Sequence, residues 1–284
     1  MFNSYTVNDE WRLARLIILG LLATGIFVGA LSNLLGIGGG ILLVPALTLL
    51  FHLPIRTAVG ASLVGIIAAS AGVAVTEKKE RKGDMRLALR LEIATTAGAI
   101  MGSVIAGMVN EKLIEIAFAF VALFTAVYMI YKIRHSNYPD VPNIAGKQED
   151  DKGEIYLHPG YHPRQWFAGL GMAGVAGSLS GLLGVSGGFI KVPILYSIMD
   201  VPFGIATTTS SIMVGITAAA SVFIYYARGD IHPLVAIPIA LGVFVGALLG
   251  NILIPYVRIA WLRSGLIGLL VFQSAQMLIK AFGA

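Results

Sequence analysis

Cysteine is missing from this sequence altogether, and charged residues are scarce. Without cysteine there is no disulfide framework, no thiolate nucleophile and no cysteine-bound metal. Only 12% of the 284 residues are Asp, Glu, Lys or Arg, whereas about 25% is usual for a soluble domain. The chain therefore has too little charge to cover the surface of a soluble protein of this length.

Hydrophobic residues make up 57% of the chain, and the mean hydropathy is +0.83. Several apolar runs are long enough to cross a bilayer, so the sequence predicts an all-α polytopic membrane protein of the cell (cytoplasmic) membrane. The first run starts at Leu13 and is too long for the core of a signal peptide, which indicates a retained helix. The net charge of +5 reports topology in such a protein and gives no reason to expect nucleic acid as a partner.

One segment of the sequence occurs twice. Residues 29–45 and 177–193 align without a gap at an offset of 148 (177 − 29), and ten of the seventeen positions are identical. Several of the identities are glycine, serine or proline, which do not interchange as aliphatic residues do. The sequence therefore predicts two homologous transmembrane repeats, 13–133 and 164–284, joined by a hydrophilic cytoplasmic linker, 134–163.

In each copy a glycine cluster interrupts an apolar run, at Gly36–Gly40 and at Gly184–Gly188. Glycine disfavours a continuous helix, so each cluster predicts a helix pair broken by a bend. The second member of each pair, 41–51 or 189–199, is too short to cross a hydrocarbon core of roughly 30 Å. A helix start presents unpaired N–H groups that suit an anion, and paired interruptions in two halves are typical of a transporter site.

The number of membrane crossings depends on how the broken pairs are counted. One crossing per pair gives eight spans, with both termini and the basic stretch 77–86 in the cytoplasm. The alternative counts every half-helix, which gives ten segments and inverted repeats. It places 77–86 outside if the N-terminus is inside, so the positive-inside rule favours eight. The helices expected on either count are 13–35, 41–51, 57–76, 87–109, 113–133, 166–183, 189–199, 203–227, 234–254 and 259–281.

The doubled pattern Gly-x-x-Ser-x-Leu-Leu-Gly-x-x-Gly-Gly-x-x-x-Val-Pro resembles the TauE/SafE family of membrane anion exporters. The Ala-x-x-x-Ser motifs at 58–62 and 206–210 and the Gly-Asp pairs at 83–84 and 229–230 also fit, and the resemblance covers roughly 13–281. It implies a secondary transporter that exports sulfite or organosulfonates by alternating access. Because the family is broad, a permease for another small anion stays open.

The candidate substrate site is built from the two glycine breaks. Their backbone N–H groups could bind an oxyanion between the halves, supplemented by nearby hydroxyl groups and one amide. The alternatives are that the glycines only allow close helix packing, and that each hydroxyl bonds to the carbonyl one turn earlier. The residues predicted to bind substrate, apart from Lys191, are Ser32, Asn33, Gly39, Gly40, Ser62, Ser180, Ser186, Gly187, Gly188 and Ser210.

Lys191 lies three residues beyond Gly188, and Leu43 stands at the equivalent place in the first copy. A cation inside a membrane segment costs from about 2.5 kcal/mol upward, so it marks a functional site by default. We expect an anionic substrate to be its partner; the alternatives are exposure at an interface and pairing with Asp200. Glu92 lies close to a basic loop and is expected to reach the interface, so no carboxylate is nominated as a proton carrier.

No pair of carboxylates, nucleophile with base, or metal-ligand spacing stands out in the sequence, so no catalytic residue, metal or cofactor is expected. An enzyme is therefore disfavoured. The rival function is a non-transporting membrane scaffold or assembly component. The expected partners are a small anion and the lipid bilayer. The aromatic helix 113–133 fits both a homodimer contact and exposure to lipid.

Overall fold

The computed structural model describes residues 4–35, 39–77, 85–135, 165–201, 203–253 and 259–282, and every regular element in these ranges is helical. Six of the described helices are long and apolar enough to cross a membrane, and two shorter apolar helices accompany them. The all-α membrane class is therefore confirmed. The basic residues 78–84 and the linker residues 136–164 lie outside the described part, so the predicted domain boundaries remain predictions.

The helices follow the predicted order, five segments on each side of the linker. The first half contains α1 (Ser4–Leu35), α2 (Gly40–Leu50), α3 (Ile55–Glu77), α4 (Met85–Met108) and α5 (Glu111–His135). The second half contains α6 (Trp166–Leu183), α7 (Gly188–Pro193), the π-helical turn η1 (Ile194–Ile198), α8 (Phe203–Ala227), α9 (Pro233–Leu253) and α10 (Ile259–Phe282).

The second half-helix differs from the single segment predicted over 189–199. Its α-helical part ends at Pro193, and a π-helical turn follows. Proline has no N–H to donate and its ring crowds the carbonyl four residues earlier, so the regular hydrogen-bond ladder is interrupted there. Single π-turns inside helices are often found at functional sites.

Each broken helix pair folds back on itself. A Cβ atom on Gly20, in the middle of α1, would lie 3.3 Å from the ring of Phe51, which follows α2. In the second half a Cβ atom on Gly169, near the start of α6, would lie 2.6 Å from Sδ of Met199, which follows η1. Helices that continued in one direction would carry these residues apart, so α2 returns along α1, and α7 with η1 returns along α6.

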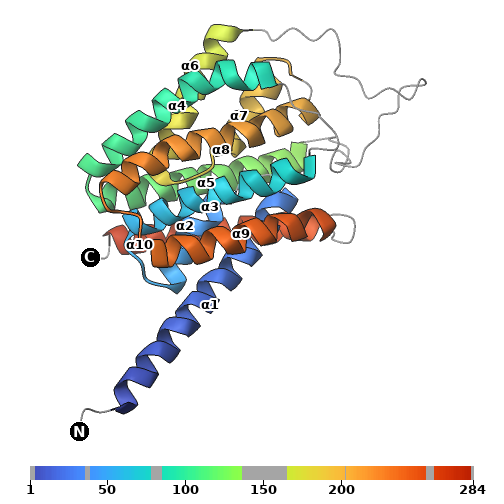
Figure 1. The fold of residues 1–284 in the computed structure, drawn as a ribbon. Coiled ribbons are helices and arrows are strands. Elements are labelled where there is room, and N and C mark those ends of the chain that lie inside the picture. Colours follow the sequence, from blue (N-terminus) through green and yellow to red (C-terminus); the bar gives the residue numbers. More distant parts are fainter. Residues whose placement is uncertain are drawn as a thin grey trace.

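The two halves interlock. Contacts are most extensive between α1 and α9 and between α4 and α6, so the first helix of each half packs on the fourth helix of the other. In Figure 1, α4 and α6 lie together on one side, α1 and α9 on the opposite side, and α3 and α8 between them. Glycine permits the close approach: a Cβ atom on Gly102 would lie 2.0 Å from the Ser178 carbonyl oxygen, and one on Gly29 would lie 2.4 Å from that of Val243.

The contacts of Arg228 bring two turns to the same end of the bundle. Arg228 follows α8, and its Nη1 donates to the Ser103 carbonyl oxygen near the end of α4. Its side chain also covers Gly107, one turn further along the same helix. The α4–α5 and α8–α9 turns therefore lie together, as Figure 1 also shows.

This arrangement does not fit the eight-span count. An odd number of crossings would then separate Asn110 from Asp230 and put them on opposite sides of the membrane. Ten segments separate them by an even number, which agrees with the two turns lying at one end of the bundle. The glycine breaks reverse the chain instead of only bending it, and sequence periodicity does not distinguish a reversal from a bend.

The direction of α1 shows at which end of the bundle the chain begins. Gly25 lies against Ile239 and Gly29 against Val243, so the contact moves in the same direction along both helices and α1 is parallel to α9. Since α9 begins just after Asp230, α1 also begins at the end where the α4–α5 turn lies. This end is opposite to the one where α3 finishes and α4 starts, on either side of the basic residues 78–84.

Candidate functional site

The two half-helices begin in the same way. Gly39 and Gly187 precede α2 and α7 with φ values of 70° and 63°, in the left-handed region that favours glycine. The Gly39 carbonyl oxygen accepts the N–H groups of Leu42 and Leu43, both at 3.0 Å. The Gly187 carbonyl oxygen likewise accepts those of Ile190 at 3.0 Å and Lys191 at 2.9 Å. The backbone conformation thus favours glycine at both positions, whether or not the breaks bind a ligand.

The two breaks touch. A Cβ atom on Gly40 would lie 2.5 Å from the Gly184 carbonyl oxygen and 3.0 Å from the Ser186 backbone nitrogen. The Ser62 hydroxyl, from α3, donates to the same Gly184 oxygen at 2.9 Å. The Ser180 hydroxyl donates to the Val185 carbonyl oxygen at 2.6 Å. The first half therefore packs directly on the second break, and close packing accounts for Gly40.

The other predicted hydroxyl groups are buried around the breaks. Ser32 is 3% exposed, and its Oγ would lie 3.2 Å from a Cβ atom on Gly39. Ser186 is buried within the second break, and Gly188 is the buried first residue of α7. Ser210, on α8, is also buried, and its hydroxyl oxygen has no hydrogen-bond partner. The side chain of Asn33 lies outside the described residues.

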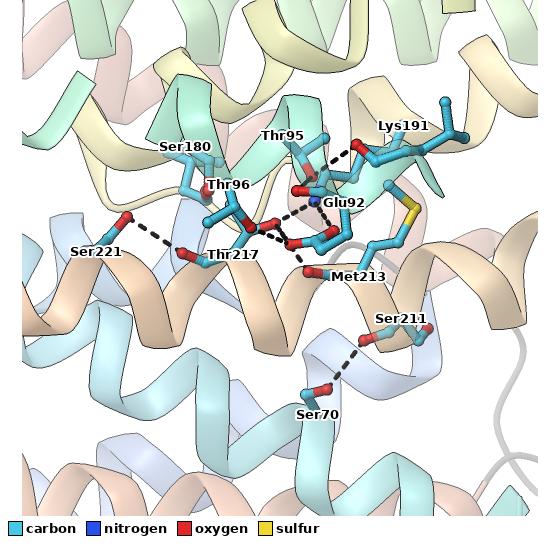
Figure 2. A network of polar contacts seen from close by, with 12 residues as sticks. Ser70, Glu92, Thr95, Thr96, Ser180, Lys191, Ser211, Met213, Thr217 and Ser221 are labelled. Carbon is cyan, nitrogen blue, oxygen red and sulfur yellow. Dashed lines mark hydrogen bonds and ion pairs between the residues drawn. The ribbon is translucent and has the colours of Figure 1, made fainter. Parts of the chain in front are cut away.

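Lys191 is buried inside the protein, with only 2% of its surface exposed. Its Nζ donates to Oγ1 of Thr217, on α8, at 2.7 Å and lies 4.0 Å from Oε2 of Glu92, on α4. Figure 2 shows the three side chains converging from separate helices. Lys191 thus neither reaches an interface nor relies on Asp200; its protein partner is Glu92. That a substrate anion binds here remains a prediction.

Glu92 does not reach the interface, so that prediction was wrong. Its side chain is 5% exposed. Oε1 accepts hydrogen bonds from Thr217 at 2.6 Å and Thr96 at 3.1 Å, whereas Oε2 has no hydrogen-bond partner. Arg90, two residues earlier, is exposed and lies over the ring of Trp166, as an interfacial residue would. The sequence did carry a signal: Glu92 falls on the helical stripe of Ala88, Thr95 and Ala99, all of which are buried.

Thr217 links the two charged groups. Its hydroxyl accepts from Lys191 and has one proton to donate, either to Glu92 Oε1 or to the Met213 carbonyl oxygen at 2.8 Å. In the sequence, Thr217 follows Lys191 by 26 positions. Glu92 precedes Lys191 by 99 positions and lies on the other side of the linker. Sequence reasoning therefore found the lysine and missed the residues that hold it.

The polar centre adjoins the second break. A Cβ atom on Gly187 would lie 3.8 Å from Cε of Lys191, so the lysine side chain passes directly over this glycine. The equivalent place near the first break is apolar. There Leu43 stands where the second half has Lys191, and both Leu43 and Ile239 of α9 lie against Gly65 and are fully buried. Only one of the two related places can therefore hold an ion.

The chemistry available at this centre is that of one cation, one carboxylate and one bridging hydroxyl. No group of three His, Cys, Asp or Glu side chains that could hold a metal occurs within the described ranges. Two charges held in a low-dielectric interior attract each other strongly, but each also loses its hydration. Such a pair suits the binding of a small anion and the transfer of a proton.

Comparison with known proteins gives a consistent result. The profile of the sulfite exporter TauE/SafE family matches residues 21–277. The chain is 26% identical over 243 residues to the probable membrane transporter protein YunE of Bacillus subtilis, covering 83% of this chain and 86% of that protein. It is 26% identical over 232 residues to the probable membrane transporter protein MJ0441 of Methanocaldococcus jannaschii, covering 78% and 79%. No solved structure shows a significant match.

Proposed function

This chain belongs to the TauE/SafE sulfite exporter family of membrane transporters, and we propose that it exports sulfite or small organosulfonates from the cell by alternating access. The observation that carries the proposal is the buried Lys191 beside the glycine break at Gly187. A buried cation in a membrane protein needs a compensating anion and marks a substrate pathway by default. The anion class and the outward direction come from the description of the family.

We place Lys191 at the centre of the substrate site, with the backbone of the second break beside it. An oxyanion bound to the ammonium group would be close to Gly187, which the lysine stem passes over and which Ser180 also adjoins. The buried hydroxyl of Ser210, on α8, has no hydrogen-bond partner and is proposed as a further donor. The first break then serves as a packing surface, which is the reason for its apolar Leu43.

The proposed membrane arrangement is ten segments in two inverted repeats. Matching features recur at the 148-residue offset: His52 and Asp200 have φ values of 51° and 55°, and Leu53 and Val201 donate to Leu47 and Leu195. With the basic residues 78–84 and the linker in the cytoplasm, the parallel course of α1 and α9 puts the N-terminus outside. This replaces the cytoplasmic termini of the eight-span count.

The rival function, a non-transporting scaffold, explains less of the molecule. A scaffold does not require two chain reversals that meet at the centre of the protein. Nor does it require a buried ion pair, whose lost hydration costs free energy. Transporters place both at the interface between repeats, where the site must open to each side in turn.

Flux measurements test the proposed function. The purified protein in proteoliposomes should exchange radiolabelled sulfite and methanesulfonate above the rate of protein-free vesicles. Inside-out membrane vesicles from cells that express the protein should take up sulfite faster than right-side-out vesicles. Absence of flux for both anions in well-folded protein would remove the proposal, whereas flux with the opposite preference would reverse only its direction.

A further inference from the structure

The geometry of the Lys191–Glu92 pair is that of two groups able to separate. Their closest atoms lie 4.0 Å apart, which is beyond hydrogen-bond distance. Both side chains are almost completely buried, at 1% and 5% exposure. A buried ion pair that serves stability needs direct hydrogen bonds to offset the lost hydration. Here the hydrogen bond that Lys191 donates to a described residue goes to Thr217, and Glu92 Oε2 has no hydrogen-bond partner.

From this arrangement we propose that Glu92 competes with the substrate anion for Lys191, and that a proton taken up by Glu92 travels with each anion. The inference rests on the proposed function and adds a coupling ion to it. With no substrate, the carboxylate of Glu92 neutralises Lys191. When an anion binds to the ammonium group, the site would hold two negative charges and one positive charge. Protonation of Glu92 restores neutrality.

The proton and the anion then move together. A proton from the aqueous side adds to Oε2 of Glu92, the oxygen that has no donor. After the anion leaves on the opposite side, Lys191 again attracts a carboxylate, and Glu92 releases its proton there. One proton and one monovalent anion cross in the same direction with no net charge. Export therefore proceeds when the outward concentration gradient of the anion exceeds the opposing inward gradient of protons.

Among the described residues, no other charged group faces Glu92 from helices α6, α7 and α8. Helices α6 and α8, which pack on α4, contain no Asp, Glu, Lys, Arg or His, and α7 contributes only Lys191. On α8 the titratable groups are the phenols of Tyr225 and Tyr226 at its far end, and Tyr196 of η1 is exposed. On α4 itself, Arg86 and Arg90 are exposed. The charge states of Glu92 and Lys191 therefore depend on each other and on a bound substrate anion.

The hydroxyl of Thr217 allows the pair to separate without leaving a polar group unpaired. It can turn its proton from Glu92 Oε1 to the Met213 carbonyl oxygen, which lies at nearly the same distance. Figure 2 shows Met213 and Glu92 both close to Thr217. The carboxyl group can thus change its protonation state while Thr217 keeps a hydrogen bond.

Methanesulfonate is the probe of choice for the test, because sulfite itself takes up a proton near neutral pH. With wild-type protein in proteoliposomes that contain a pH indicator, an inward methanesulfonate gradient should acidify the lumen. Affinity should fall by up to about tenfold per pH unit on the alkaline side of the Glu92 titration, since one proton binds with each anion. Glu92→Gln should lose this pH dependence over the range in which Lys191 keeps its charge, and should move no protons.

The matched control is Glu115→Gln, because Glu115 is the other buried carboxylate among the described residues. It should keep the wild-type pH dependence and proton movement. Wild-type dependence in Glu92→Gln, or its loss in Glu115→Gln, would overturn the coupling while leaving anion transport intact. If wild-type protein moves neither methanesulfonate nor sulfite, the proposed function fails and takes the coupling with it.

Infrared difference spectroscopy tests the same inference without changing Glu92, in case the variant does not fold. Addition of methanesulfonate to the wild-type protein should produce the carbonyl band of a newly protonated carboxylic acid. The band should also appear with Glu115→Gln. Binding of methanesulfonate without such a band would overturn the proposal.

Discussion

Gly40 lies directly against the backbone of Gly184, so close that a methyl group on Gly40 would sit 2.5 Å from the Gly184 carbonyl oxygen. One glycine belongs to the first break and the other to the second. The contact fixes how the two halves meet, and Ser62 reinforces it by donating to the same oxygen. The packing of the two halves at the breaks therefore depends on the absence of a side chain at Gly40.

Gly40→Ala should destabilise the protein by about 1–3 kcal/mol, because the new methyl group meets backbone atoms that do not move independently. Thermal unfolding in detergent measures the effect as a lower Tm. Gly171→Ala is the control, since a Cβ atom there meets nothing within 4 Å. Equal Tm values for the two variants would contradict the close contact between the breaks.

Lys191→Met should abolish methanesulfonate binding and also lower stability. It leaves the buried Glu92 without its cation, a change that typically costs about 3–5 kcal/mol. The double variant Lys191→Met/Glu92→Gln should recover much of the lost stability but none of the binding. Binding is measured by equilibrium uptake of the labelled anion and stability by thermal unfolding.

Leu43→Met is the matched control for Lys191→Met, because Leu43 occupies the equivalent place beside the first break. This change conserves volume in an apolar surrounding and should cost less than about 1.5 kcal/mol. It should leave methanesulfonate affinity within a factor of about two, as expected for an interaction difference of a few tenths of a kcal/mol. Unchanged affinity in a well-folded Lys191→Met protein would exclude Lys191 from the site.

Thr217→Val keeps the shape of the side chain but removes the hydroxyl that joins the ion pair. A hydrogen bond to a charged group is worth about 1.5–3 kcal/mol, so both the Tm and methanesulfonate affinity should fall. Ser221→Ala, one turn further along α8, removes only a hydroxyl that donates to the Thr217 carbonyl oxygen at 3.3 Å. A larger effect of Ser221→Ala on affinity would show that Thr217 does not link the charges.

Single cysteine labels can determine the topology, because the chain has no cysteine of its own. Ten segments predict that cysteines at Asn110 and at Asp230 react with an impermeant reagent from outside. Cysteines at Lys79 and at Gln148 should react only after the membrane is permeabilised. Labelling of Asp230 from the cytoplasm, with Asn110 still outside, would restore the eight-span count.

A cross-link between cysteines at Gly20 and Phe51 tests the reversal of the first broken pair. Because α2 returns along α1, a short bifunctional thiol reagent should join the two positions within one chain. A cysteine at Phe27, which is 67% exposed, should not join one at Phe51. Digestion followed by mass spectrometry identifies the linked peptides. Linkage of the control pair alone would mean that α2 does not fold back towards Gly20.

Local chemistry accounts for what the sequence determined. The scarcity of charge and the long apolar runs required a membrane protein, and the doubled glycine pattern revealed two related halves and the family. Helix positions followed from the same runs. Gly39 and Gly187 could be identified from the sequence as sites of a helix break. The positive φ of a chain reversal favours glycine, so the conformation is visible in the residue type.

The tertiary structure decided what depends on contacts between distant segments. Whether each break reverses the chain is settled by Gly20 against Phe51 and Gly169 against Met199, which no periodicity encodes. Glu92 lies near a helix start in the sequence, yet packing against α6 and α8 buries it opposite Lys191. A charged residue near a helix end has the same local pattern whether its helix face meets lipid headgroups or protein, so its surroundings and partner are fixed only when the halves assemble.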